Sequence, residues 1–315
     1  MTPALDKTAS SPVSGPAETA ARLPYPALVS ELQHLLHDRT VAVAPRLVLP
    51  LAGGASLFVM PALDGHTAIT KLITYTPGNA GSSRATIQGD VLVFDVATGE
   101  RRLVLDGPTV TARRTAAVSV LAALRLAPCR QGPLLIVGAG VQGGAHLEAF
   151  AECLGSREFL IASRSLASAD RLVAHAQSLG LKARAVPDAN AAMAECPMAV
   201  TCTPASAVVL SAAPRPDAFI AAVGAFTPCM AELGAGLCRH FAAHGTIVLD
   251  TLDALHEAGD LLQAGLDISR FASLADVVRG SEAFQTRGPV LFKSCGWAGW
   301  DLAAARTAMA LAAAQ

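Results

Sequence analysis

The chain is poor in charged and in aromatic residues. Of its 315 residues, 16% are charged and 4% are aromatic, and the formal net charge is −1. A nucleic-acid-binding protein needs a basic face for the phosphates, and this near-neutral composition does not supply one. A disordered chain combines high charge with low hydrophobicity, whereas 52% of these residues are hydrophobic. We therefore expect a folded protein that does not bind nucleic acid.

Long apolar runs and paired cysteines are also missing. No window approaches the roughly 18 to 20 uninterrupted apolar residues of a membrane-spanning helix, so we expect no membrane association. The seven cysteines are scattered without a C-x-x-C pair, which disfavours a zinc ribbon and a disulfide framework. Two histidine pairs, at 34/37 and 240/244, lack the glutamate of H-E-x-x-H and a third ligand. We expect no metal site.

The first twenty residues have neither the basic end nor the apolar block of a signal peptide. They are rich in proline, serine and threonine, and we predict that residues 1–20 form a mobile tail. A cytoplasmic location is the corresponding expectation.

The first half of the chain after this tail is predicted to be strand-rich. Pro24-Tyr25-Pro26 opens a helix, and residues 41–51, 56–60, 68–75 and 90–96 have the composition of strands separated by Gly, Pro and Asn. The segment 97–100 between two such strands is typical of a hairpin turn. This half should therefore be mostly antiparallel.

The second half alternates short apolar runs with helical stretches, from about Thr109 onward. A helix through Leu126 precedes candidate strands at 134–137, 159–162, 183–186, 198–202, 218–223 and 246–249, and the chain ends in a helix at 300–314. This alternation predicts a parallel sheet covered by helices on both faces. The expected fold class is α/β, with a Rossmann-type doubly wound parallel sheet plus a mixed α+β domain.

A dinucleotide-binding motif follows the first of these parallel strands. Gly138-Ala139-Gly140-Val141-Gln142-Gly143 lies directly after the apolar strand and opens a helix, which is the context that this otherwise weak pattern requires. Gly138 suits the tight turn, Gly140 the approach of backbone to pyrophosphate, and Gly143 the packing of helix on strand. Val141 and Gln142 belong to the same phosphate-binding helix N-terminus.

The end of the next strand predicts which cofactor is used. Enzymes that use NAD usually have Asp or Glu about 20 residues after the motif, to bind the ribose 2′-hydroxyl. Here Ser163, Arg164 and Ser165 stand in that region. A guanidinium can grip a 2′-phosphate through two hydrogen bonds. We therefore predict NADPH as the cofactor, with NADH less favoured.

Three isolated cations lie in apolar surroundings in the expected mixed α+β domain. They are Arg46, Lys71 and Arg114, and each would be costly to bury unless it met an anion. An arginine binds a carboxylate through two hydrogen bonds, and a nearby lysine can orient it or move a proton. Together they predict a carboxylate-binding site. Arg113, the neighbour of Arg114, should point elsewhere and be solvated.

These segments together resemble the ornithine cyclodeaminase/mu-crystallin family over most of the chain beyond the tail. The resemblance is carried by the Arg46 and Lys71 segments, residues 111–117, the glycine motif, Val223-Gly224-Ala225, Glu232-Leu233, Gly259-Asp260 and Phe292-Lys293-Ser294-Cys295-Gly296. It implies a homodimer in which residues 21–118 and 299–315 form the substrate-binding and dimerisation domain. Residues 119–298 would form the NADP-binding domain. It also implies that Arg46, Lys71 and Arg114 hold the carboxylate of an amino or imino acid.

Phe226 distinguishes between activities of that family. Cyclodeaminases carry an aspartate at this place in the turn, where it engages the amine of ornithine, and an apolar ring cannot do so. The chain is therefore more similar to the family's reductases of cyclic ketimines, Δ1-pyrroline-2-carboxylate and Δ1-piperideine-2-carboxylate. Arg46 and Arg114 would clamp the carboxylate, Lys71 would complete the clamp and keep the imine nitrogen protonated or relay its proton, and Phe226 would cover the ring.

Further residues and alternatives stay open at this point. Thr203 and Val223 are expected along the cofactor edge and Ser294 near the nicotinamide, whereas Thr86 and Gln88 fit either the substrate face or a strand surface. The alternatives are an ornithine cyclodeaminase with a displaced acid, a protein that binds NADPH and a small hydrophobic ligand, and a reductase of sulfur-containing or linear ketimines.

Overall fold

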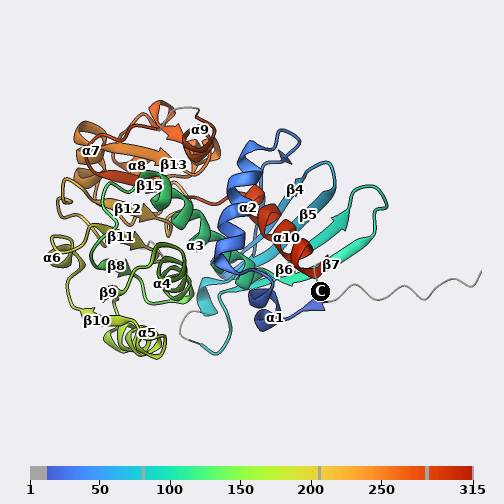
Figure 1. The fold of residues 1–315 in the computed structure, drawn as a ribbon, viewed down its shortest axis with the longest axis horizontal. Coiled ribbons are helices and arrows are strands. Elements are labelled where there is room, and N and C mark those ends of the chain that lie inside the picture. The colour runs from blue at the N-terminus through green and yellow to red at the C-terminus, as the bar shows by residue number, and fades with distance from the viewer. Residues whose placement is uncertain (1–12, 80–81, 205–206, 281–283, 314–315) are drawn as a thin grey trace, which may run out of the picture.

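The computed structural model describes residues 13–79, 82–204, 207–280 and 284–313, and within these it contains two separate sheets (Figure 1). No helix of this described part is long and apolar enough to cross a membrane. The expected fold class is confirmed: the larger sheet is parallel throughout, and the smaller one is mainly antiparallel.

The smaller sheet has the order β1-β7-β6-β5-β4-β2, and β3 also pairs with β4. Helices α2, α3 and α10 contribute to the apolar core on one of its faces. The elements in this half are β1 (Val13–Ser14), α1 (Pro16–Ala21), α2 (Tyr25–His37), β2 (Ala42–Val43), β3 (Leu47–Pro50), β4 (Ser56–Leu63), β5 (Thr67–Tyr75), β6 (Ile87–Asp95), β7 (Arg101–Asp106) and α3 (Gly107–Leu126).

Two expectations for this half need correction. The tail predicted for residues 1–20 is too long, because β1 pairs with β7, α1 is helical, and Thr19 is buried with its hydroxyl bonded to the Ser14 carbonyl. Residues 1–12 lie outside the described part. The strand predicted over 41–51 is interrupted, and Arg46 lies in the gap between β2 and β3.

The larger sheet has the order β10-β9-β8-β11-β12-β15-β13-β14, with the strand direction shared by all neighbours. The elements in this half are β8 (Leu134–Val137), α4 (Val141–Leu154), β9 (Glu158–Ala162), α5 (Leu166–Ser178), β10 (Lys182–Val186), α6 (Ala189–Ala192), β11 (Met198–Thr201), β12 (Phe219–Ala222), α7 (Ala235–His244), β13 (Thr246–Leu249), α8 (Gly259–Gln263), β14 (Ala272–Ser273), α9 (Leu274–Arg279) and β15 (Val290–Lys293). The last helix of the chain is α10 (Ala298–Ala313).

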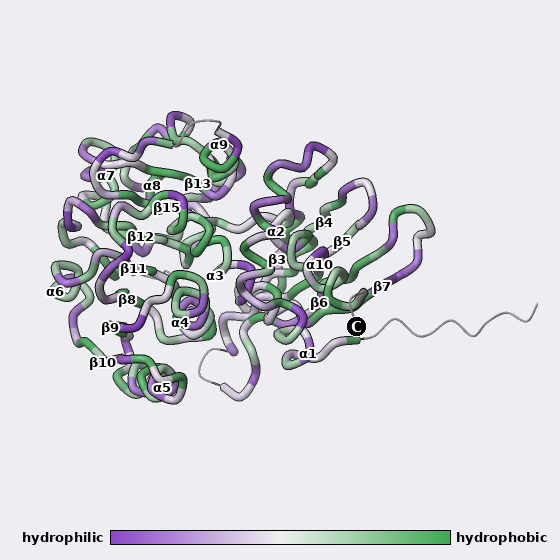
Figure 2. Tube along the Cα trace, viewed as in Figure 1, coloured by the Kyte–Doolittle hydropathy of each residue, from purple (hydrophilic) through white to green (hydrophobic). Residues whose placement is uncertain are grey.

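Burial explains why the sequences of these strands are continuous apolar runs. Every residue of β8, β11 and β12 is buried, as expected for parallel strands that are covered on both faces. Surface helices are amphipathic instead, and α5 shows both hydrophobic and hydrophilic residues in Figure 2. Of α5, only Ala169, Leu172 and Ala176 are buried. The strand β15, which lies between β12 and β13, was absent from the expected strands.

Helices α3 and α10 connect the two halves. The first begins where Asp106 accepts a hydrogen bond from the Thr109 amide and continues unbroken to Leu126, through the boundary expected at 118/119. The last helix, α10, follows β15 and returns to lie against β4 and β5 of the smaller sheet (Figure 1). Trp300 and Asp301 near its start are fully buried. These two helices bring residues of both halves to one place.

Candidate functional site

The glycine motif forms the turn between β8 and α4. Gly138 has φ of 119°, a conformation that favours glycine, and a Cβ there would lie 2.8 Å from the Cys202 carbonyl oxygen. A Cβ on Gly143 would collide with the Gly138 carbonyl. At Gly140, by contrast, a Cβ would meet nothing within 4 Å. The packing of the chain therefore requires the first and last glycines, whereas the open space at Gly140 fits a ligand that approaches the backbone.

Replacing Gly140 by alanine is expected to weaken binding of a nicotinamide dinucleotide about 10- to 100-fold without loss of thermal stability. Its φ of −91° suits alanine, so the cost falls on the ligand-bound state alone. Gly144→Ala is the matched control, because its Cβ would make only ordinary contact with Leu172 at 3.9 Å. Fluorescence titration and thermal melts measure both quantities, and equal affinities of the two variants would contradict this role of Gly140.

The residues after β9 lie beside this turn, because β9 is the neighbour of β8. Ser163 is half-buried, and Ser165 accepts a hydrogen bond from the Ser168 amide at the start of α5. Arg164 is exposed and makes no hydrogen bond or ion pair within the described part of the chain. Its guanidinium is thus available to an anion at this edge of the sheet.

The N-terminus of α4 also carries Val141 and Gln142. Val141 is 75% exposed, while Gln142 is half-buried and donates from Nε2 to the Thr111 carbonyl of α3 at 3.4 Å. Gln142 therefore links the glycine turn to the helix that carries Arg114. Its Nε2 is used within the chain, so its backbone is the part available to a phosphate.

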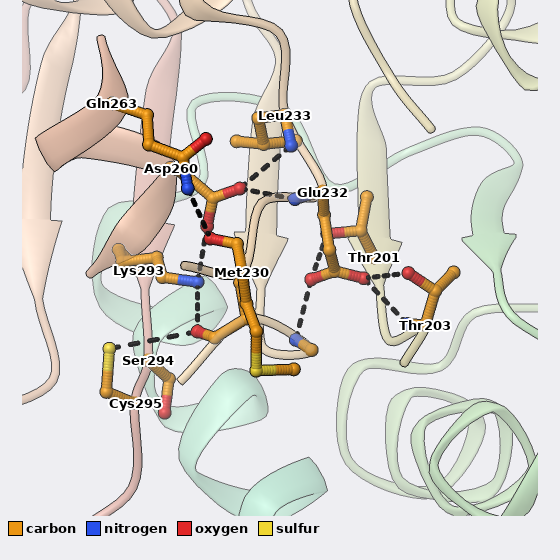
Figure 3. A network of polar contacts seen from close by, with 12 residues as sticks. Thr201, Thr203, Met230, Glu232, Leu233, Asp260, Gln263, Lys293, Ser294 and Cys295 are labelled. Atoms are coloured by element: carbon orange, nitrogen blue, oxygen red, sulfur yellow. Dashed lines mark hydrogen bonds and ion pairs between the residues drawn. The ribbon is translucent and has the colours of Figure 1, made fainter. Parts of the chain in front are cut away.

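A network of buried charges lies under the carboxyl ends of β11, β12 and β15 (Figure 3). Glu232 accepts hydrogen bonds from the Thr203 amide and hydroxyl, at 2.6 and 2.9 Å, and from the Gly224 amide at 2.6 Å. Asp260 accepts from the Glu232 amide at 2.6 Å and pairs with Lys293 Nζ, also at 2.6 Å. These contacts fix the loop ends on which Thr203 and Val223 lie.

The charge state of this network follows from its burial. Burial raises the pKa of Glu232, and hydrogen bonds from Thr203 and the charge of Lys293 oppose that rise. Burial also acts against the charge of Lys293, but the neighbouring acidic groups outweigh it and raise the pKa of this lysine. Lys293 Nζ further donates to the Ala225 carbonyl at 2.6 Å, beside Phe226. The network thus holds the backbone that presents Phe226.

Ser294 has a comparable structural connection. It is buried, and its hydroxyl donates to Asp250 Oδ2 at 2.8 Å, as does the Gly296 amide. Asp250 directly follows β13, so this contact joins the ends of neighbouring strands. The segment after β15 is held in place by the same carboxylate.

Lys71 and Arg114 share one buried carboxylate. Lys71 Nζ lies 2.7 Å from Asp301 Oδ2, and Arg114 Nε lies 3.2 Å from Asp301 Oδ1. Lys71 is 1% exposed and Asp301 is fully buried. Burial lowers the pKa of Lys71 to about 8, against the attraction of Asp301. The anion that these cations were expected to require is thus supplied in part by the chain itself.

Arg46 reaches the same place from the gap between β2 and β3. Its guanidinium donates to Glu257 Oε2 at 2.6 Å and to the Gly296 carbonyl at 2.7 Å. A Cβ on Gly296 would lie 3.3 Å from an Arg114 guanidinium nitrogen, so the guanidinium groups of Arg46 and Arg114 both lie close to Gly296. The three cations face two carboxylates, Asp301 and Glu257, so the cluster has a formal excess of one positive charge.

A pocket of about 240 Å³ opens next to this cluster, between the two sheets. Arg46 and Glu257 provide its charged groups, and Phe226, Phe58 and Tyr75 provide apolar walls. The Phe226 and Tyr75 rings meet edge to face at 6.2 Å between centroids. Lys71 and Arg114 do not line this pocket. Its size and apolar lining suit a small ring with one anionic group.

Two other residues lie away from this pocket. Thr86 is half-buried, and its carbonyl accepts from the Thr76 amide, but it does not line the pocket. Arg113 points away from the site, as predicted, but the expectation that it is solvated is wrong. Its guanidinium lies 3.8 Å from the centre of the Tyr25 ring and donates to the Leu23 carbonyl.

Sequence reasoning did not identify the acidic partners in this site. Asp301 and Glu257 had no predicted role, and Glu232, Asp260 and Lys293 were noted only as carriers of a resemblance. Asp301 stands between Trp300 and a run of apolar residues. An isolated carboxylate in such surroundings needs a partner just as an isolated cation does, so the argument applied to Lys71 would also have singled out Asp301.

The model of the ornithine cyclodeaminase/mu-crystallin family matches residues 19–313. The chain belongs to this family. Among curated relatives, Delta(1)-pyrroline-2-carboxylate reductase 2 of Burkholderia ambifaria is 42% identical over 305 residues, with 94% of each chain covered. Delta(1)-pyrroline-2-carboxylate/Delta(1)-piperideine-2-carboxylate reductase of Azospirillum brasilense is 40% identical with the same coverage.

A solved structure has the same fold. It is the Delta(1)-pyrroline-2-carboxylate reductase of Thermococcus litoralis in complex with NADH and L-proline, with a TM-score of 0.81. The match covers 94% of this chain and 92% of that one, at 23% sequence identity. The likeness therefore extends over both sheets of this family member.

Proposed function

We propose that this protein reduces cyclic ketimines of the Δ1-pyrroline-2-carboxylate and Δ1-piperideine-2-carboxylate type to L-proline and L-pipecolate, with NAD(P)H as the hydride donor. The observation that carries the proposal is the pocket in which Arg46 and Phe226 lie together, at the edge of the sheet that bears the glycine turn. The relative that is 42% identical is named as a reductase of Δ1-pyrroline-2-carboxylate, and the one that is 40% identical as a reductase of both substrates.

Different residues of the site are proposed to bind different parts of the substrate. The carboxylate of the imino acid would take the one excess positive charge of the Arg46, Lys71 and Arg114 cluster, which orients C2 toward the cofactor. Lys71 and Arg114 do not line the pocket and are buried against Asp301, so they would contribute their charge from behind its wall. Phe226 would cover the methylene groups of the ring. An apolar ring at this position cannot bind the amine of ornithine, which disfavours cyclodeaminase chemistry.

The cofactor site is proposed at the carboxyl edge of the larger sheet. Gly138, Gly140, Val141, Gln142 and Gly143 would hold the pyrophosphate on the amides of α4. Thr203, Val223 and Ser294 follow the ends of β11, β12 and β15, and they would contact the cofactor between the glycine turn and the pocket. The cofactor supplies a hydride from the nicotinamide ring. Arg164, exposed beside Ser163 and Ser165, supports NADPH as the preferred form.

We assign substrate binding to residues 21–118 with 299–315, and cofactor binding to residues 119–298. Residues 13–20 belong with the first unit, because β1 and α1 pack on β7 and α3. The unbroken helix α3 joins the two units, so the assignment describes chemical roles within one connected structure.

The decisive experiment is an NADPH oxidation assay with four substrates: pyrroline-2-carboxylate, piperideine-2-carboxylate, pyruvate with ammonia, and pyruvate with methylamine. We expect rapid oxidation with both cyclic imines and slow oxidation with the pyruvate mixtures. Activity with pyruvate and ammonia but none with either cyclic imine would overturn the proposal. Release of ammonia from ornithine would instead indicate a cyclodeaminase.

We also propose that the protein forms a homodimer through the open face of the smaller sheet. In the register of this sheet Leu47, Val59 and Leu72 are cross-strand neighbours, as are Leu49 and Leu57. Leu47, Leu49 and Leu72 are 51%, 43% and 41% exposed. Soluble proteins rarely leave such a contiguous apolar surface uncovered, because burying it against a partner is favourable.

Replacing Leu49 by aspartate is therefore expected to convert the dimer into a monomer at micromolar concentration. A carboxylate at the centre of an apolar interface would lose its hydration without gaining a partner. Leu179→Asp is the matched control, since Leu179 is 49% exposed at the end of α5 in the other half. Sedimentation velocity measures the mass of each, and a dimeric Leu49→Asp protein would contradict this interface.

A further inference from the structure

Reduction of a C=N bond requires a proton at nitrogen as well as a hydride at carbon, and most groups of the site are poorly placed to supply that proton. Lys71 is 1% exposed and paired with Asp301, and Phe226 has no proton to give. The Ser294 hydroxyl donates to Asp250. Glu257 is the one carboxyl group among the described residues that line the 240 Å³ pocket.

Glu257 is well placed to exchange protons. It follows the 3₁₀ turn Leu252–His256, and its side chain is 22% exposed, so one side faces the pocket and solvent can reach it. Its charged neighbours are Arg46 from the other half, and Asp250 and Asp253 from its own half, and the thiol of Cys295 is a further titratable group near it. Burial raises the pKa of Glu257 to about 7, against the attraction of Arg46.

The ion pair with Arg46 adds a link to substrate binding. Arg46 is one of the groups proposed to hold the substrate carboxylate. Its NH2 group already donates hydrogen bonds to the Glu257 carboxylate and to the Gly296 carbonyl. A substrate carboxylate on Arg46 would remove the counter-ion of Glu257 and add a negative charge beside it. Both changes favour the protonated form of the glutamate.

We propose that Glu257 is the catalytic acid of the reduction. The substrate carboxylate takes the place of Glu257 on Arg46, and this displacement favours the protonated form of Glu257. This rests on the proposed function. The C2–H bond forms with the hydride, the π electrons of C=N move to nitrogen, and the N–H bond forms with the proton of Glu257. The carboxylate left behind regains its proton from solvent. No further oxidant or reductant is needed.

The test is Glu257→Gln, which keeps the shape of the side chain and removes its titratable proton. We expect kcat for pyrroline-2-carboxylate to fall about 100-fold or more, while the Kd for NADPH changes less than about 3-fold. In the wild type kcat should be highest at low pH and fall as pH rises through the pKa that Glu257 has in the substrate complex. This fall should be absent in Glu257→Gln, and Glu257→Asp should restore part of the rate.

Asp253→Asn is the matched control, because Asp253 contributes charge near Glu257 but does not line the pocket. Asp253→Asn should retain the wild-type kcat and the decrease of kcat with rising pH. Calorimetry of L-proline binding in two buffers of different ionisation enthalpy gives an independent readout: the wild type should take up a proton and Glu257→Gln should not.

The failures of the two proposals differ. A wild type that reduces neither cyclic imine overturns the proposed function and this role with it. A wild type that reduces them, with Glu257→Gln within 3-fold of its kcat and unchanged in pH profile or proton uptake, overturns the role of Glu257 alone.

Discussion

Replacing Asp301 by asparagine is expected to lower the free energy of unfolding by about 3–5 kcal/mol, the usual cost of removing one partner from a buried ion pair. The effect should be large because Asp301 serves two cations. Lys71 and Arg114 would remain side by side in the core without their shared counter-ion, at 1% and 6% exposure. Lys71 would respond with a further fall in its pKa, because burial already lowers it.

Urea denaturation followed by circular dichroism measures this loss. Asp217→Asn is the matched control: its 2.8 Å pair with Arg215 lies at the surface, and its removal should cost less than about 1 kcal/mol. The double variant Lys71→Met/Asp301→Asn should recover part of the stability, because one uncompensated cation is then gone. Equal stability of Asp301→Asn and Asp217→Asn would show that the buried carboxylate is not needed by these cations.

Replacing Arg164 by aspartate is expected to invert the cofactor preference, with a change of about 100-fold or more in the NADPH to NADH ratio of kcat/KM. Two charge-assisted hydrogen bonds to a 2′-phosphate would be lost, at about 1.5–3 kcal/mol each, and 1.4 kcal/mol corresponds to a factor of ten. The new carboxylate would repel the phosphate and accept hydrogen bonds from the 2′-hydroxyl of NADH.

Steady-state kinetics with both cofactors gives the ratio directly. Arg171→Asp on the exposed side of α5 changes the net charge by the same amount, and Arg171 contacts Ser168 of its own helix at 2.8 Å. This control should leave the ratio within about 3-fold of the wild type. An unchanged ratio in Arg164→Asp would remove the argument for NADPH.

The parts of this structure that sequence could predict are those decided by local rules. The glycine turn was predictable because a strand, three glycines and a helix follow one another within a few residues, and Gly138 and Gly143 do show the close contacts that such a turn requires. The parallel sheet was predictable from its apolar runs. The strand β15 was missed, because only three apolar residues precede Lys293, and the buried partners of this lysine, Asp260 and the Ala225 carbonyl, are distant in the sequence.

The acidic half of the site could not be assembled in the same way. Asp301 is 230 residues from Lys71 in the sequence, Glu257 is 211 residues from Arg46, and neither pair has a spacing rule. Only the path of α10 back to β4 and β5 places Asp301 under Lys71. The cost of burying a charge does predict that each cation has an anion, but it does not say whether the anion belongs to the chain or to a ligand.

The network of Glu232, Asp260 and Lys293 has a consequence for how such enzymes diversify. It holds the turn after β12 by hydrogen bonds to backbone atoms, the amide of Gly224 and the carbonyl of Ala225, and these bonds do not depend on the side chain at position 226. Mutations at that position can therefore change the wall of the pocket while the turn keeps its conformation. Selection can exchange a phenylalanine for an acidic residue there, and so explore new substrates, without first repairing the fold.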